Sequence, residues 1–197
     1  MSDPSAFIRA ETALSAPPLV PEIRLHLASE ILPIWQATEA DLARHGLPPP
    51  YWAFAWPGGQ ALTRHLLDHR ELVAGRRVLD FAAGSGLSAI ALNANTNGVD
   101  VALIEEDILG SPGDWPSDWD VILAGDVCYE RPMAERVAAW FTELANAGRL
   151  VLIGDPGRSY LPGSGLREIA RYLVPTTLEL EYCTLRETVV WRWESGA

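Results

Sequence analysis

A glycine-rich turn follows a short apolar run near the middle of the chain. The run spans residues 78–81, the turn is Ala82-Ala83-Gly84-Ser85-Gly86, and residues 87–92 have helical spacing. Such a turn lets backbone N–H groups approach a ligand at a helix N-terminus, and Asp80 at the end of the run can accept a hydrogen bond from a ligand amine. Ordinary strand-to-helix turns also contain glycine, so the turn alone is a weak signal. The P-loop pattern Gly-x-x-x-x-Gly-Lys is absent, which argues against a nucleoside triphosphatase of that class.

A second apolar run, residues 120–124, ends in Gly125-Asp126 and is followed three residues later by Tyr129. In a parallel sheet this order puts a carboxylate and a phenol at the carboxyl edge, where open α/β sheets bind ligands. Asp126 could equally be a residue that caps the following helix. The two stretches together favour a ligand site.

The elements that would position these groups alternate along the chain. We predict strands at residues 78–81, 101–104, 120–124 and 150–153, and helices at residues 60–69, 87–92 and 133–145. Strands separated by helices indicate an α/β fold with a parallel sheet. Two alternating runs, residues 177–183 and 188–193, predict a C-terminal antiparallel hairpin at the sheet edge.

The first 50 residues are predicted to form an N-terminal helical accessory segment. Residues 22–30 and 39–45 show helical spacing, and prolines at positions 48, 49 and 50 stiffen the chain into an extended connector. We therefore expect two parts, residues 1–50 and residues 51–197, of which the second binds the ligand.

Composition narrows the class of protein. The chain has 197 residues, 48% of them hydrophobic and 21% charged, which fits a globular chain of ordinary size and excludes a disordered or fibrous one. Its 26 acidic residues outnumber 15 Lys and Arg, giving a net charge of −11. A chain without a cationic surface is not expected to bind nucleic acid.

Cysteine and histidine spacing gives no sign of a metal site or a disulfide framework. Cys128 and Cys183 lie far apart in the chain, and His65 and His69 have the spacing of a metal-ligand pair but no third ligand nearby. We expect no metal, and we expect the two histidines on an exposed helix face. The sequence shows neither a basic segment leading into an apolar run near its start nor an apolar stretch of membrane-spanning length, so we expect a cytoplasmic protein without membrane contact.

Several motifs together resemble one enzyme family. Leu79-Asp-Phe-Ala-Ala-Gly-Ser-Gly86 resembles the first S-adenosylmethionine motif of class I, seven-β-strand methyltransferases, and Asp126-Val-Cys-Tyr129 is similar to the Asp-x-x-Tyr pattern of their protein-lysine branch. The stretch around Trp56-Pro-Gly-Gly59 and the closing residues 188–192 resemble bacterial members of the electron transfer flavoprotein β-subunit lysine methyltransferase family.

The resemblance implies a Rossmann-like class I sheet, S-adenosyl-L-methionine as cofactor and S-adenosyl-L-homocysteine as product. It implies cofactor-binding roles for Trp56, Asp80, Ala82, Gly84, Ser85, Gly86, Glu106, Asp107 and Gly125. Within this set, Asp80 and the glycine turn would hold the methionine end, and Glu106 and Asp107 would precede the adenine pocket. Ala82 stands where many relatives have glycine, which the turn accommodates if the φ angle of Ala82 stays negative.

The implied activity is methyl transfer to lysine side chains of a protein, with the electron transfer flavoprotein β subunit as the expected substrate. Asp126 and Tyr129 would be the catalytic pair that orients the lysine amine. Methyltransferases of nucleic acid bases or glutamine carry Asn/Asp-Pro-Pro-Tyr at this point, and Val127-Cys128 replaces both prolines here. A small-molecule N-methyltransferase and a non-catalytic S-adenosylmethionine-binding module stay open as alternatives.

The chain is short for this fold. Between the glycine turn and the run at residue 120, the fold needs two further strands and two helices, and only residues 87–119 are available. A strand with its helix and loops takes on the order of 20 to 25 residues. We therefore expect one strand–helix unit to be missing near residues 90–93, including the strand whose acid would bind the cofactor ribose.

Overall fold

The computed structural model describes residues 9, 12–28, 51–83, 93–104, 107–109 and 119–195. These residues fall into two compact units. One unit comprises residues 1–55 and 83–105, and the other comprises residues 56–82 and 106–197.

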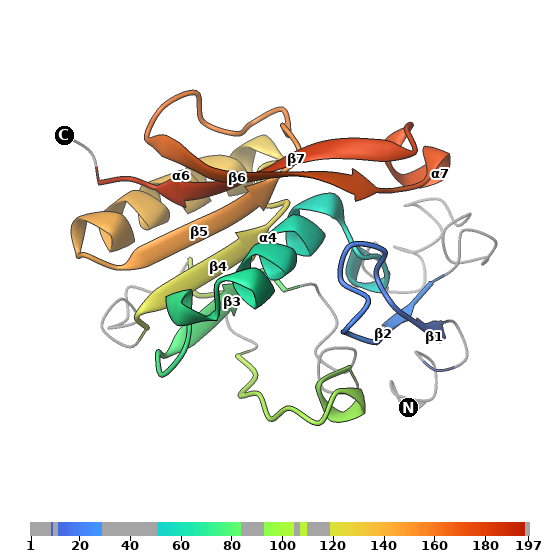
Figure 1. Ribbon diagram of the computed structural model, residues 1–197. Coiled ribbons are helices and arrows are strands. Elements are labelled where there is room, and N and C mark those ends of the chain that lie inside the picture. The colour runs from blue at the N-terminus through green and yellow to red at the C-terminus, as the bar shows by residue number, and fades with distance from the viewer. Residues whose placement is uncertain are drawn as a thin grey trace. The chain divides into compact units, whose positions relative to one another are not determined.

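The larger unit is built on a five-stranded mixed sheet in the order β3-β4-β5-β7-β6 (Figure 1). Its strands are β3 (Val78–Phe81), β4 (Val121–Gly125), β5 (Leu150–Asp155), β6 (Leu166–Pro175) and β7 (Leu185–Trp193). The first three strands are parallel to one another, and β7 runs antiparallel to both β5 and β6. The predicted α/β class is confirmed.

Two helices cover opposite faces of this sheet, α4 (Pro57–Asp68) on one face and α6 (Arg131–Asn146) on the other (Figure 1). The apolar residues of α6 recur every three or four positions and are buried, as an amphipathic helix requires. They pack against alternate residues of β4 and β5, including Ile122 and Ile153. Among the described helices, none is both long and apolar enough to cross a membrane.

Most predicted elements of the larger unit are confirmed. Strand β3 has the predicted bounds, β4 and β5 differ from them by at most two residues at an end, and α4 and α6 contain most of the predicted helical residues. Continuous apolar runs bounded by glycine or charged residues are characteristic of strands buried on both faces.

The C-terminal hairpin is confirmed, although its first strand lies earlier in the chain than predicted. Strand β6 ends at Pro175, and the segment expected as a strand at residues 177–183 contains the short helix α7 (Leu178–Glu181). The side chain of Thr177 accepts a hydrogen bond from the N–H of Leu180, and the first turn carries two glutamates. A threonine cap followed by acidic residues favours a helical turn over the extended backbone that the alternating pattern suggested.

The predicted strand at residues 101–104 is wrong. These residues form no strand, and the side chains of Val101, Leu103 and Ile104 are exposed. No described strand pairs with these residues, so their backbone joins no ladder among the described residues. Consistent with that, β3 is the outermost strand of its sheet among the described residues.

The smaller unit contains a two-stranded antiparallel sheet of β1 (Ala13–Ser15) and β2 (Leu25–Leu27), and a 3-10 turn, η1 (Tyr51–Ala53). The helix expected at residues 22–30 is therefore wrong for its described part, and the helix expected at residues 39–45 lies outside the described residues.

Hydrogen bonds from asparagine side chains explain why residues 24–26 are extended and not helical. Asn93 accepts a hydrogen bond from the N–H of His26 at 2.7 Å, and Asn97 both accepts from the N–H of Arg24 and donates to its carbonyl. These amides satisfy backbone groups that a helix would have paired internally. Residues 93–96 are helical, and this helix ends before Gly98, whose φ of 67° is typical of a glycine that terminates a helix.

Candidate active site

Three glycines allow helix α4 to touch the carboxyl ends of two strands. A Cβ atom on Gly58 would lie 2.1 Å from the carbonyl oxygen of Gly154, and one on Gly154 would lie 2.0 Å from the carbonyl oxygen of Gly58. A Cβ atom on Gly125 would lie 2.8 Å from the backbone of Gly59. No residue with a side chain fits these positions without displacing the backbone. The N-terminus of α4 is thus fixed directly against the ends of β4 and β5.

Asp126 follows β4 at this contact and binds the first amides of α4. Its Oδ2 atom accepts hydrogen bonds from the N–H groups of Gly58, at 2.6 Å, and Gly59, at 3.3 Å. Its own N–H donates to the carbonyl of Gly154 at 2.9 Å, and its φ of 54° lies in the left-handed region. A buried carboxylate at a helix N-terminus is stabilised by the unpaired amides and by the helix dipole.

Arg158 holds the other oxygen of this carboxylate. Its Nε and Nη2 atoms donate to Oδ1 of Asp126 at 3.0 and 2.7 Å. The same guanidinium donates to both carboxylate oxygens of Glu181 in helix α7, at 2.5 and 3.2 Å. It also lies 5.8 Å from the ring centroid of Trp56, within cation–π range. One arginine therefore joins the end of β4, the start of α4 and the C-terminal hairpin.

Asp155, the last residue of β5, fixes the loop that carries Arg158. Its Oδ1 atom accepts hydrogen bonds from the N–H groups of Gly157 and Arg158, both at 2.7 Å. Its side chain is buried, and its Oδ2 atom has no hydrogen-bond partner among the described residues. The turn from Asp155 to Arg158 follows β5, which ends at the same sheet edge as β4. A loop at this edge was the one sequence signal that could have identified Arg158 as a site residue. The partnership with Glu181 left no sequence signal.

Burial controls the ionisation of Asp126. Desolvation raises its pKa to about 6, while the charge and hydrogen bonds of Arg158 and the amide of Gly58 act in the opposite direction. The carboxylate is therefore ionised at neutral pH. Each of its two oxygens accepts two hydrogen bonds, which makes the carboxylate a fixed negative charge and leaves little capacity to accept further hydrogen bonds.

Cys128 and Tyr129, which follow Asp126 and have reactive side chains, differ in exposure. Cys128 is buried, and burial raises the pKa of its thiol to about 12, so it stays protonated and is no nucleophile. Tyr129 is half exposed and lies between β4 and the start of α6, on the carboxyl side of the sheet.

Asp80 is the last residue but one of strand β3, near the same sheet edge as Asp126, since β3 and β4 are parallel and Asp80 pairs with Leu123. Its side chain is accessible to solvent, and no donor of the described residues bonds to it. Desolvation by the surrounding protein nevertheless raises its pKa to about 6. A carboxylate of this kind is well suited to receive a cationic group.

The backbone angle of Ala82, two residues after Asp80, differs from the prediction. Ala82 has a φ of 54°, not the negative angle expected for an alanine in this turn. The chain must reverse directly after β3, and the left-handed conformation accomplishes this at a cost of about 1 kcal/mol for a residue with a Cβ atom.

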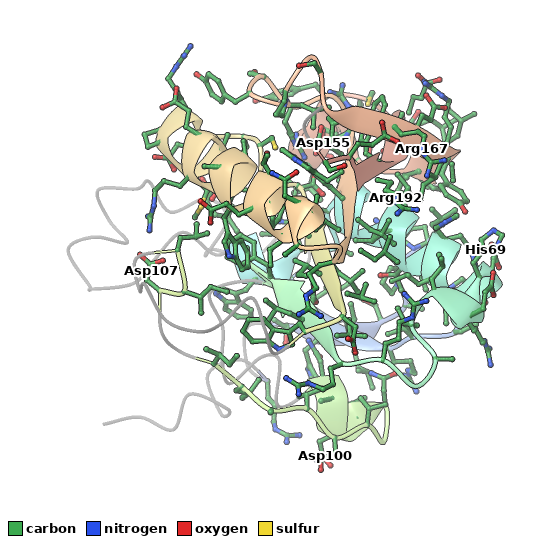
Figure 2. The ribbon with its side chains drawn as sticks, turned by 90° about the vertical axis from the view of Figure 1, so that its left-hand side faces the viewer. His69, Asp100, Asp107, Asp155, Arg167 and Arg192 are labelled. Carbon is green, nitrogen blue, oxygen red and sulfur yellow. The ribbon has the colours of Figure 1, made fainter. Side chains whose placement is uncertain are left out.

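Asp107, one of the predicted cofactor residues, is not brought into this cluster. Asp107 is exposed, accepts a hydrogen bond from the N–H of Leu109 and forms an ion pair of 2.9 Å with Arg136 on α6. Figure 2 shows it well apart from Asp155. Gly84, Ser85, Gly86 and Glu106 lie outside the described residues. Of the predicted set, the structure gathers Trp56, Gly125 and Asp126.

The histidine pair on α4 is not the exposed face that we expected. His65 is 6% exposed, and its Nδ1 atom lies 3.4 Å from the hydroxyl of Tyr172 on β6. Burial lowers its pKa, which keeps the ring neutral. His69, half exposed, lies at the C-terminal end of the helix (Figure 2). His65 is therefore part of the packing between α4 and the hairpin.

Comparison with known proteins gives a consistent result. No protein-family model matches the chain. It is 33% identical to the electron transfer flavoprotein beta subunit lysine methyltransferase of Danio rerio, over 89% of this chain and 77% of that protein. It is 32% identical to the proteins of the same name from Xenopus laevis, over 97% of this chain and 87% of the relative, and Homo sapiens, over 96% and 81%.

The matches also show that this chain is shorter than the matched region of its relative. The match to the Xenopus laevis protein spans 220 residues, which exceeds the whole chain of 197 residues. The relative therefore has residues inside the matched region that face gaps in this chain. The position of the predicted missing unit, near residues 90–93, lies at the edge of a part outside the described residues and stays a prediction.

Proposed function

Because the chain belongs to the electron transfer flavoprotein β-subunit lysine methyltransferase family, we propose that it transfers methyl groups from S-adenosyl-L-methionine to lysine side chains of an electron transfer flavoprotein β subunit. The cluster of Trp56, Asp126 and Arg158 at the carboxyl edge of the sheet is the proposed centre of this activity.

The residues at this edge fit the methionine end of the cofactor. Its α-ammonium group needs an anionic acceptor, and Asp80 offers a solvent-accessible carboxylate that no described residue donates to. We assign cofactor binding to Asp80, to the turn that begins at Ala82, to Trp56 and to Gly125. When bound, the cofactor supplies an electrophilic methyl group on a sulfonium sulfur.

The protein's own task is to present a neutral lysine amine. Free lysine has a pKa near 10.4, so a neutral amine at pH 7 costs roughly 4.6 kcal/mol unless the site helps. An aromatic wall at Trp56 excludes water from one side and thereby disfavours the charged amine. The proton leaves to solvent before transfer, and the product again carries a positive charge.

Asp126 supports that positive charge. Its carboxylate is buried, ionised at neutral pH and held by α4 and Arg158, so its negative charge is in place before the lysine arrives. We assign Asp126 an electrostatic and positioning role, and Tyr129 the role of orienting the amine through its hydroxyl. A free general base is not required, because the nucleophile loses its proton to water.

The observation that carries the proposal is the buried Asp126–Arg158 pair at the N-terminus of α4, in a chain of this family. The test is transfer of a labelled methyl group from S-adenosylmethionine into a lysate of cells that lack the protein. A labelled protein band of the size of the electron transfer flavoprotein β subunit supports the proposal. Label found only in small metabolites points to a small-molecule N-methyltransferase and contradicts it.

A further inference from the structure

We propose that the tip of the β6–β7 hairpin is the surface on which the protein substrate docks, an inference that rests on the proposed methyltransferase activity. Four large apolar side chains at this tip are exposed, and we call them the apolar tip. They are Leu173 (61% exposed), Leu178 (57%), Tyr182 (90%) and Leu185 (55%).

The apolar tip lies at the same edge of the sheet as the proposed active site. Strand β7 runs antiparallel to β5 and pairs Val189 with Asp155, so its first residues, from Leu185, lie beyond the carboxyl end of β5. Figure 1 shows the hairpin and α7 extending past α4 and β5 at this edge. A protein bound at the tip would therefore lie beside the point where a lysine must enter.

Helix α7 connects the tip to the site physically. Glu181, the last residue of α7, is buried and binds Arg158, which in turn binds Asp126. Leu178 and Tyr182 lie one helical turn apart, and the N–H of Tyr182 donates to the carbonyl of Leu178. Helix α7 and the residue that ends it thus expose two of the apolar side chains, and the last residue of the helix holds the active-site arginine.

Folding alone does not account for Tyr182. Its φ of 56° lies in the left-handed region, which glycine or asparagine adopts at lower cost, and its ring contacts no aromatic or charged group of the described residues. Tyrosine is among the residue types that contribute most to binding at protein interfaces. Strain and exposure at one residue together indicate a role outside the fold.

The charge around the apolar tip fits a lysine-bearing partner. Residues 173–187 contain three glutamates and one arginine, and two of the glutamates are already paired: Glu181 is buried against Arg158, and Glu187 binds Arg171. Among these, Glu179 is exposed and forms no ion pair with a described residue. An apolar centre beside an exposed carboxylate that is free of ion pairs matches a folded protein surface that has apolar side chains next to a lysine. The partner to which we commit is the folded electron transfer flavoprotein β subunit.

The test is calorimetric titration of the full chain with purified electron transfer flavoprotein β subunit. Tyr182→Gly removes the ring and relieves the left-handed backbone, so we expect it to melt at or above the temperature of the wild type and to bind at least tenfold more weakly. Leu178→Ser should weaken binding in the same direction. Val99→Ser is the matched control, because Val99 is 56% exposed and lies in the smaller unit.

Unchanged affinity in Tyr182→Gly and Leu178→Ser overturns the proposal, as does absence of binding by the wild type. Self-association that the two variants abolish also overturns it, because the tip would then contact a second copy of this chain. Methyl transfer measured in parallel separates the two claims. Binding without transfer contradicts the proposed function alone, and transfer with an unchanged KM in the variants contradicts the docking surface alone.

Discussion

Nη2 of Arg158 lies 2.7 Å from Oδ1 of Asp126, and this pair joins two loops that leave neighbouring strands at the carboxyl edge of the sheet. The carboxylate faces the amides of α4 on its other side. Its negative charge is therefore fixed on two sides by groups that the fold itself positions.

Two substitutions of Asp126 distinguish the effect of its charge from the effect of its hydrogen bonds. Asp126→Asn keeps an oxygen for the amides of α4 and removes the charge, so we expect transfer to fall at least about 100-fold while the protein remains folded. Asp126→Ala should in addition lose about 3 kcal/mol of stability, because it leaves Arg158 and the Gly58 amide without their partner. Steady-state kinetics and urea unfolding measure the two effects. Near-normal turnover of Asp126→Asn would show that the charge has no catalytic role.

The pH dependence of transfer should report the Asp126–Arg158 pair. Burial raises the pKa of Asp126 to about 6, so transfer should decline as the pH falls through 6 and the carboxylate becomes protonated. The charge of Arg158 lowers this pKa. Arg158→Gln should therefore shift the acid limb of the profile to higher pH. An acid limb at the same pH in both proteins would mean that another group controls it.

The carboxylate of Asp80 should lower the stability of the fold and strengthen the binding of the cofactor. Although the Asp80 side chain is accessible to solvent, desolvation by the surrounding protein raises its pKa to about 6, from an ordinary 3.8, so the folded state binds its proton more tightly than the unfolded state. The ionised carboxylate of Asp80 therefore destabilises the folded state. This destabilisation is absent at pH values below 3.8, develops as the pH rises toward 6, and is complete above that. Asp80→Asn should then raise the free energy of unfolding at pH 7 by about 1 kcal/mol, a figure reduced for solvent access. It should also weaken S-adenosylmethionine binding in calorimetry. Equal cofactor affinity in the variant would remove Asp80 from the binding site.

Contact between α4 and β5 should tolerate no side chain. Gly154→Ala places a Cβ atom 2.0 Å from the carbonyl oxygen of Gly58, and we expect a loss of about 3 kcal/mol in thermal or urea unfolding together with loss of transfer. Gly163→Ala is the matched control, because nothing lies within 4 Å of its Cβ position. Similar unfolding curves for the two variants would show that the packing of α4 is looser than described.

Local sequence patterns predicted the parts of the fold that depend on neighbours in the chain. The strand of residues 78–81 and the helix that buries Val137 and Phe141 follow from continuous apolar runs and from helical spacing. Asp126 and Trp56 could be located because each belongs to a short motif with glycine beside it.

Pairings between distant residues could not be predicted in this way. Glu181 lies in the run Leu-Glu-Leu-Glu, whose alternation is typical of a strand, and only its partner Arg158 reveals why it is buried in a helix. His65 has the spacing of a surface pair, but Tyr172 of a distant strand packs over it. Residues 101–104 have the composition of a strand, but they pair with no strand of the described part of the chain. In each case the deciding contact is a tertiary one that the local pattern does not contain.

The most direct test of the central claim uses three purified components: the protein, S-adenosylmethionine and the electron transfer flavoprotein β subunit. Mass spectrometry of the β subunit after incubation should show added methyl groups on lysine side chains with the wild-type enzyme, and at least about 100-fold slower methylation with Asp126→Asn. An unmodified β subunit after incubation with a folded, cofactor-binding wild-type enzyme would contradict the account.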